Sequence, residues 1–205
     1  MKLLAIDGKL YKFMSTLWSV LKLNFFWIVF SLPIVTIGIS TIAAFSVSLK
    51  IAEGIDGKIF EDFWNSYKKN FKQGLILGIG TLAICYAIYL NIEFFNKIEN
   101  NPIMFLIAAI FIAIVSLAHL TYAFPLLARY NNSIKQTLSN SREIVYKYIF
   151  RTILLWIIVA LLCVFFIFNF VLIFIGILIG PATIILTISS FAIKIFHNIE
   201  KDNMS

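Results

Sequence analysis

Few residues of this chain could perform chemistry within its long apolar stretches. His119 is the only histidine inside such a stretch, and an ionisable group in that setting is a candidate proton relay or ligand. No carboxylate lies well inside an apolar stretch to partner it. We therefore favour a neutral imidazole that hydrogen-bonds a neighbouring helix, with the proton relay as the alternative.

A second candidate is a row of small and hydroxyl residues near the end of the chain. Its members recur three or four residues apart, so they share one face of a helix. They are Gly176, Gly180, Thr183, Thr187 and Ser190. Such a face either lets another helix approach closely, with hydroxyls bonding across the contact, or lines a polar path. We favour a helix-packing face because no charge accompanies it.

Proline interrupts an apolar segment near each end of the chain, at Pro33 and Pro181. Backbone groups freed by Pro33 need partners in a bilayer, and we expect them from the nearest hydroxyls, those of Ser31 and Thr36. In secondary transporters, interrupted segments in matching halves mark a substrate site at the middle of the membrane. A chain of 205 residues is short for that architecture, and no clear internal repeat supports it. A small transporter or channel for a neutral solute is therefore the alternative function.

The sequence contains no pattern typical of an enzyme. No nucleophile–base pair, phosphate-binding loop or metal-ligand cluster is recognisable, and Gly78-Ile79-Gly80 lies inside an apolar run instead of after a strand. Cys85 and Cys163 also lie in apolar runs, which argues against a disulfide framework or a zinc site. We expect no catalytic, cofactor-binding or metal-ligating residues, no cofactor and no enzyme activity.

Composition defines the broad class of protein. Hydrophobic residues make up 61% of the chain and charged residues only 13%, against about 25% charged residues in soluble domains. Several uncharged runs reach the roughly 18 residues that a membrane-spanning helix needs. The sequence therefore predicts an all-α fold, a polytopic transmembrane helical bundle.

The net charge of +7 could suggest nucleic acid as a partner. The lysines and arginines lie in loops beside apolar spans, however, where they orient the chain and meet anionic lipid headgroups. We therefore expect the lipid bilayer with its anionic headgroups as a partner, and no nucleic acid.

The expected organisation is a single membrane domain over residues 1–205. After an interfacial segment at 2–14, we expect an N-terminal hairpin at 15–52, a cytoplasmic amphipathic loop at 53–73, spans at 74–95 and 103–127, a cytoplasmic loop at 128–151, and a C-terminal hairpin at 152–193. The last stretch would be about 63 Å long as one helix, twice the roughly 30 Å hydrocarbon core, so it must fold back. Asn169 and Gly176 are the expected turn positions.

The positive charges favour about six membrane passes. If residues 15–52 cross the membrane twice, every lysine and arginine except Lys97 falls on one side, which the positive-inside rule makes cytoplasmic. Both termini are then cytoplasmic. If Lys22 lies at the interface, too little helix precedes Pro33 to cross, and the alternative is a re-entrant N-terminal hairpin plus four spans.

The loop at 53–73 carries aromatic residues at helical spacing, with lysines on the opposite face. This pattern predicts an amphipathic interfacial helix that lies on the membrane surface or against the bundle. Its aromatic residues are Phe60, Phe63, Trp64, Tyr67 and Phe71.

One motif resembles a known family. The segments Leu23-Asn24-Phe25-Phe26-Trp27 and Ser31-Leu32-Pro33-Ile34-Val35-Thr36-Ile37-Gly38 resemble the start of the YesL-like integral membrane proteins, a domain of unknown function in Gram-positive bacteria. The likeness continues in Phe63 to Gly74 and Phe124 to Tyr130. Its structural motif residues are Asn24, Trp27, Pro33, Thr36 and Gly38.

The resemblance implies a multi-pass protein of the bacterial cell membrane. Such proteins are often encoded beside carbohydrate importers, two-component sensors and glycoside-degrading enzymes, and no catalytic residues carry over. We therefore expect an accessory or structural component linked to carbohydrate uptake or sensing, with importer or sensor subunits as partners. The sequence does not determine an oligomeric state.

Overall fold

The computed structural model describes residues 9–55, 57–98 and 102–202. These residues are almost entirely helical and include no β-strand, which confirms the all-α class. Six helical segments within them are long and apolar enough to cross a membrane, as expected of a polytopic helical protein.

The elements follow one another with short connections. In chain order they are α1 (Lys9–Ser31), the 3₁₀ turn η1 (Ile34–Thr36), α2 (Ile37–Glu53), α3 (Ile59–Lys69), α4 (Phe71–Lys97), α5 (Ile103–Leu120), α6 (Ala123–Arg129), α7 (Ile134–Lys147), α8 (Ile149–Ile167) and α9 (Phe170–Asp202).

Helix α2 forms the centre of the molecule. It packs against α1, α3, α4, α6 and α9. In its most apolar stretch 56% of the residues are buried, against 17% or less in the corresponding stretches of the other candidate membrane spans. Small residues on α2 make this possible, because Ser40, Ala43 and Ala44 are all fully buried and let several helices approach.

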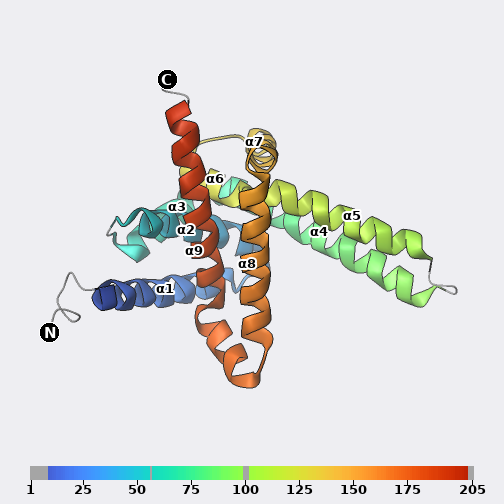
Figure 1. The fold of residues 1–205 in the computed structure, drawn as a ribbon, viewed down its shortest axis with the longest axis horizontal. Helices are drawn as coiled ribbons and strands as arrows, with labels where there is room; N and C mark the ends of the chain where they lie inside the picture. The colour runs from blue at the N-terminus through green and yellow to red at the C-terminus, as the bar shows by residue number, and fades with distance from the viewer. Residues whose placement is uncertain (1–8, 56, 99–101, 203–205) are drawn as a thin grey trace.

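Helical hairpins extend from this centre in different directions (Figure 1). The α4–α5 hairpin extends to the right in that view, the α8–α9 hairpin points downward, and α1 lies to the left. The projecting arms expose large apolar side chains, including Phe111 at 67% and Phe170 at 84%. Lipid is the natural environment for such surfaces, because contiguous apolar patches of this kind are rare on soluble proteins.

The break between α1 and α2 is stabilised by one of the two hydroxyls nearest to Pro33. Pro33 cannot donate a backbone hydrogen bond, so nearby carbonyls need other partners. Thr36 Oγ1 lies 2.7 Å from the carbonyl oxygens of both Phe30 and Pro33, to which it donates. The Ser31 hydroxyl is buried and has no partner among the described residues. Thr36 therefore fills the expected role and Ser31 does not.

Gly38 places this break beside the start of α4. A Cβ atom built on Gly38 would lie 2.3 Å from the Gly74 carbonyl oxygen and 2.5 Å from Gly78 Cα, so the two backbones touch. The topology of two full passes puts residues 31–38 and the start of α4 on opposite sides of the membrane. The contact favours the re-entrant alternative for α1 and α2, because it places the turn beside the start of α4.

This contact leads to a topology prediction. In a background with both native cysteines replaced by serine, Val35→Cys should resist a membrane-impermeant maleimide added outside intact cells. A matched Asn96→Cys at the far end of α4 should be labelled, because α4 and α5 meet there as a hairpin. Equal labelling of both cysteines would show instead that residues 15–52 cross the membrane fully.

Several expected boundaries differ from the structure. The loop at 53–73 holds all of α3 and the first residues of α4, the span at 103–127 divides into α5 and α6, and the loop at 128–151 contains α7. The interfacial segment at 2–14 lies mostly outside the described residues, and α1 begins at Lys9.

The C-terminal hairpin is longer than the uncharged stretch suggested. Its turn lies at Asn169, whose Oδ1 accepts a hydrogen bond of 2.9 Å from the Leu172 backbone N–H and so caps α9. Gly176 is not a turn position, because it lies inside α9. The helix continues beyond Ile193 to Asp202, because Ile195 and Phe196 are buried against the rest of the protein.

Candidate functional site

Asn24 of α1 inserts its side-chain amide into the backbone of α9. The side chain is 1% exposed. Its Nδ2 donates to the carbonyl oxygens of Ile177 at 2.9 Å and Leu178 at 2.8 Å, and its Oδ1 accepts from the Ala182 backbone N–H at 3.1 Å. Both the amide nitrogen and the amide oxygen of Asn24 are therefore bonded to one short segment of α9.

The position of Pro181 explains these bonds. A proline has no N–H, so the carbonyl four residues earlier, that of Ile177, loses its usual helical partner. The Asn24 carboxamide has the same donor and acceptor as a peptide group and takes that partner's place. Helix α9 thus passes through Pro181 without leaving the Ile177 carbonyl unpaired in an apolar interior.

The other motif residues continue the same structural unit. Trp27, one turn after Asn24, donates its indole N–H to Thr41 Oγ1 on α2 at 3.2 Å. Thr36 closes the turn and Gly38 contacts α4, as described above. The motif therefore joins α1 to α9 and α2, and α2 to α4; Asn24 and Thr36 bond backbone groups, and Trp27 bonds a hydroxyl of α2.

The aromatic residues of α3 pack against α1, not on an isolated membrane surface. Phe63 is fully buried, and its ring centroid lies 6.1 Å from that of Phe26 and 5.4 Å from that of Phe30. Trp64 and Tyr67 also contact Phe30. The expected amphipathic helix is thus docked on the bundle.

The ends of the aromatic row are more exposed. Phe60 is 48% exposed and Phe71 is 45% exposed. Phe71 is the first residue of α4, separated from α3 by the buried Asn70. Lys68 and Lys69 face outward, as the amphipathic pattern predicts.

The small and hydroxyl residues of α9 divide into two groups. Gly176 and Gly180 face Phe166 of α8, and a Cβ atom built on Gly176 would lie 3.0 Å from Phe166 Cβ. The hydroxyls do not bond across to another helix. Each donates to a carbonyl four residues earlier in α9, from Thr183 to Ile179 at 2.8 Å, Thr187 to Thr183 at 2.9 Å and Ser190 to Leu186 at 2.8 Å.

His119 also bonds within its own helix. Its Nδ1 lies 2.8 Å from the Val115 carbonyl oxygen, which can only accept, so Nδ1 carries the proton of this bond. The expected bond to a neighbouring helix is not formed. In the part of the chain that the structure describes, no group of three or more histidine, cysteine, aspartate or glutamate residues could hold a metal ion.

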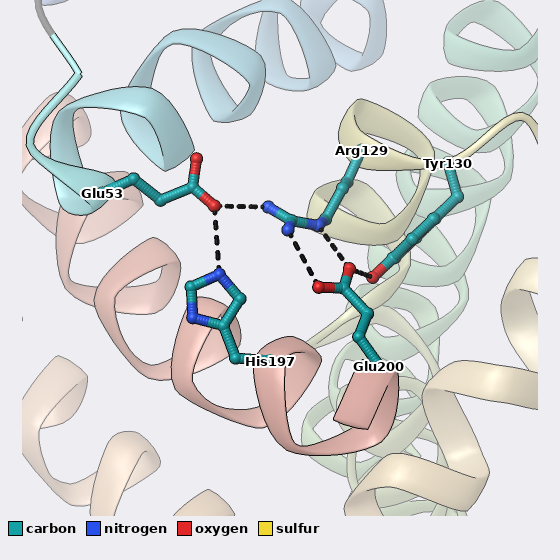
Figure 2. A network of polar contacts seen from close by, with 5 residues as sticks. All are labelled: Glu53, Arg129, Tyr130, His197 and Glu200. Atoms are coloured by element: carbon teal, nitrogen blue, oxygen red, sulfur yellow. Dashed lines mark hydrogen bonds and ion pairs between the residues drawn. The ribbon is translucent and has the colours of Figure 1, made fainter. Parts of the chain in front are cut away.

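An ion-pair network that the sequence did not suggest lies where α2, α6 and α9 end (Figure 2). Arg129 is its centre, and its Nη1 donates to Glu53 Oε1 at 2.7 Å. Its Nε and Nη2 donate to the two carboxylate oxygens of Glu200 at 3.0 and 3.3 Å, a two-pronged contact. His197 Nε2 lies 3.3 Å from Glu53 Oε1, and Tyr130 donates its hydroxyl to Glu200.

The network is partly shielded from solvent. The Glu53 side chain is 19% exposed and that of Arg129 22%, and Glu200 is 34% exposed. Burial raises the pKa of Tyr130 to about 12, and its hydrogen bond to the negatively charged Glu200 adds to the rise. Tyr130 therefore stays protonated throughout the physiological pH range, and its O–H donates a hydrogen bond to Glu200.

The sequence offered only weak signals for this network. Arg129 and Tyr130 fall in the segment that resembles the YesL-like family. His197 and Glu200 are three residues apart and so share a helix face, but this is informative only once α9 is known to extend beyond residue 193.

Removing the central cation should destabilise the protein. Arg129→Gln leaves Glu53 and Glu200 without their counter-charge, and we expect a loss of about 1–3 kcal/mol. Thermal unfolding in detergent micelles, followed by circular dichroism, would measure it. Lys97→Gln is the control, because Lys97 pairs with Glu93 at 2.6 Å while 73% exposed, and such pairs contribute about 0–1 kcal/mol. Equal losses in the two variants would mean that the network adds no more stability than an exposed ion pair.

Fold and site together define an α-helical multi-pass membrane protein whose polar groups hold its helices together. Residues 20–92 match the model of a family described as "Protein of unknown function, DUF624". The matched region runs from α1 into α4 and includes all the structural motif residues, and it is consistent with the YesL-like resemblance. No curated protein and no solved structure matches the chain.

Proposed function

We propose that this protein is an accessory or structural component of a carbohydrate-uptake or sensing system in a bacterial cell membrane, with both termini in the cytoplasm. The link to carbohydrate rests on the family resemblance. The orientation rests on the distribution of lysine and arginine. The match to a family of unknown function over residues 20–92 is compatible with this role.

The observation that carries the proposal is the use of polar groups to fix helices. Asn24 pairs with the backbone of α9, and Arg129 fixes the ends of α2, α6 and α9 relative to one another. A protein built this way presents a fixed surface at the end of its helices. Such a surface suits a subunit that other proteins bind.

The transporter alternative has less support from these contacts. It relied on the breaks at Pro33 and Pro181 and on the hydroxyl row of α9. The Asn24 amide occupies the break at Pro181, where Leu23 and Ala182 are fully buried, and the hydroxyls are engaged within α9. Proteoliposomes containing the purified protein should therefore show no osmotic swelling in neutral sugars; swelling above that of empty liposomes would favour transport.

The proposal is tested by isolating the protein with its neighbours. The chain would carry an affinity tag at its chromosomal locus, and native membranes would be cross-linked before extraction in mild detergent. We expect importer or sensor subunits to co-purify, and Arg129→Gln to reduce their recovery more than Lys97→Gln does. A stable homo-oligomer isolated alone would contradict the proposal.

A further inference from the structure

A polar cavity lies at the end of α1 and α2 that is remote from the Pro33 turn. Its volume is about 610 Å³, and residues from α1, α2 and the start of α3 line it. The α1 side contributes Tyr11, Lys12, Thr16 and Ser19, and the other wall contributes Lys50 and Asp62. None of these side chains takes part in the contacts described above for Asn24 or Arg129.

The hydroxyls that line the cavity differ from most others in the protein. Thr41, Thr183 and similar residues donate to carbonyls of their own helices. Within the described residues, no hydrogen bond engages the hydroxyls of Thr16 or Ser19. Both groups are therefore available as donors to a bound molecule.

The charge of the cavity favours an anion. Lys50 Nζ lies 2.7 Å from Asp62 Oδ1, so these two charges compensate each other. Lys12 forms no ion pair with any described carboxylate. Among the described residues that line the cavity, the positive charge of Lys12 is left over, on the same wall as the free hydroxyls.

The opposite face of α1 is apolar and open. Leu10, Phe13, Met14 and Trp18 fall at positions i, i+3, i+4 and i+8 of the helix, and they are 44%, 63%, 56% and 60% exposed. A helix with one such face and one face of lysine and hydroxyl groups lies at the boundary between acyl chains and headgroups. The cavity therefore lies on the polar face of a helix whose other face suits acyl chains.

From this arrangement we propose that the cavity binds the headgroup of an anionic phospholipid. The lipid phosphate accepts hydrogen bonds from the Lys12 ammonium and from the hydroxyls of Thr16 and Ser19. Its acyl chains follow the apolar face of α1. This site does not depend on the accessory role proposed above.

Lipid titrations followed by native mass spectrometry test the site. The protein in neutral detergent would be titrated with phosphatidylglycerol, with phosphatidylcholine and with inorganic phosphate. We expect selective retention of phosphatidylglycerol. Lys12→Gln should weaken its binding about fivefold, the effect expected of one basic residue near an anionic membrane surface. The double variant Thr16→Val/Ser19→Ala should also weaken it.

The matched control is Lys135→Gln on α7, which removes the same charge from an exposed position outside the cavity. This variant should bind phosphatidylglycerol like the unmodified protein. An equal effect of the two lysine variants would overturn the proposal in favour of diffuse attraction. Equal binding of phosphatidylcholine, or of inorganic phosphate at the same concentrations, would overturn it as well. Circular dichroism melts would establish that the variants are folded.

Discussion

Asn24→Leu should lower the free energy of unfolding by about 2–4 kcal/mol, because leucine has a similar size but cannot hydrogen-bond α9. The variant leaves the Ile177 carbonyl unpaired in the interior, and Pro181 prevents α9 from supplying the missing donor. The carbonyl of Leu178 and the N–H of Ala182 can pair with each other if α9 relaxes. Chemical unfolding in mixed micelles, followed by circular dichroism, would measure the loss.

A double-mutant cycle with Pro181→Ala distinguishes this mechanism from a general packing defect. Alanine restores the N–H that can donate to the Ile177 carbonyl, so α9 no longer needs the Asn24 amide. We expect the double variant Asn24→Leu/Pro181→Ala to lose less stability than the sum of the two single losses, since the residues act on the same groups. Strictly additive losses would show that Asn24 does not act by pairing the carbonyl that Pro181 leaves without a donor.

Gly78→Ala should destabilise the contact between α2 and α4 by about 1–3 kcal/mol. The added Cβ atom would lie 2.8 Å from Gly38 Cα and 2.9 Å from Gly38 N. Both are backbone atoms, so no side chain can rotate away and the helices must separate. The same unfolding measurement would record the effect.

Gly80→Ala is the matched control in the same helix. A Cβ atom built on Gly80 meets nothing within 4 Å. Alanine favours a helix over glycine by up to about 1 kcal/mol, so this variant should be neutral or slightly more stable. If Gly78→Ala behaved like Gly80→Ala, the close approach of α2 and α4 would not contribute to stability.

Local sequence patterns predicted the class of protein and several local features. Runs of uncharged apolar residues indicate membrane-spanning helices because their length must match the bilayer. The aromatic row around Phe63 predicted an amphipathic helix, and Thr36 was identified as a partner for the backbone near Pro33. Asn169 was identified as a turn. Each of these features depends on residues within a few positions of one another.

Boundaries were less predictable where burial overrides local polarity. The segment after Lys194 is polar in composition, yet α9 continues through it to Asp202 because Ile195 and Phe196 are buried. Gly176 was expected at a turn. It lies within α9, where its missing side chain accommodates Phe166.

The sequence by itself determined that this chain is a polytopic helical membrane protein with a polar-capped break at Pro33, because chain length, apolarity and proline chemistry act locally. Only the tertiary structure decided which distant groups meet. Asn24 hydrogen-bonds α9 at Ala182, which is 158 residues away in the chain. Arg129 joins the ends of separate helices. Nothing in the local sequence records such pairings, because they arise only when helices pack and bring buried polar groups from distant segments together.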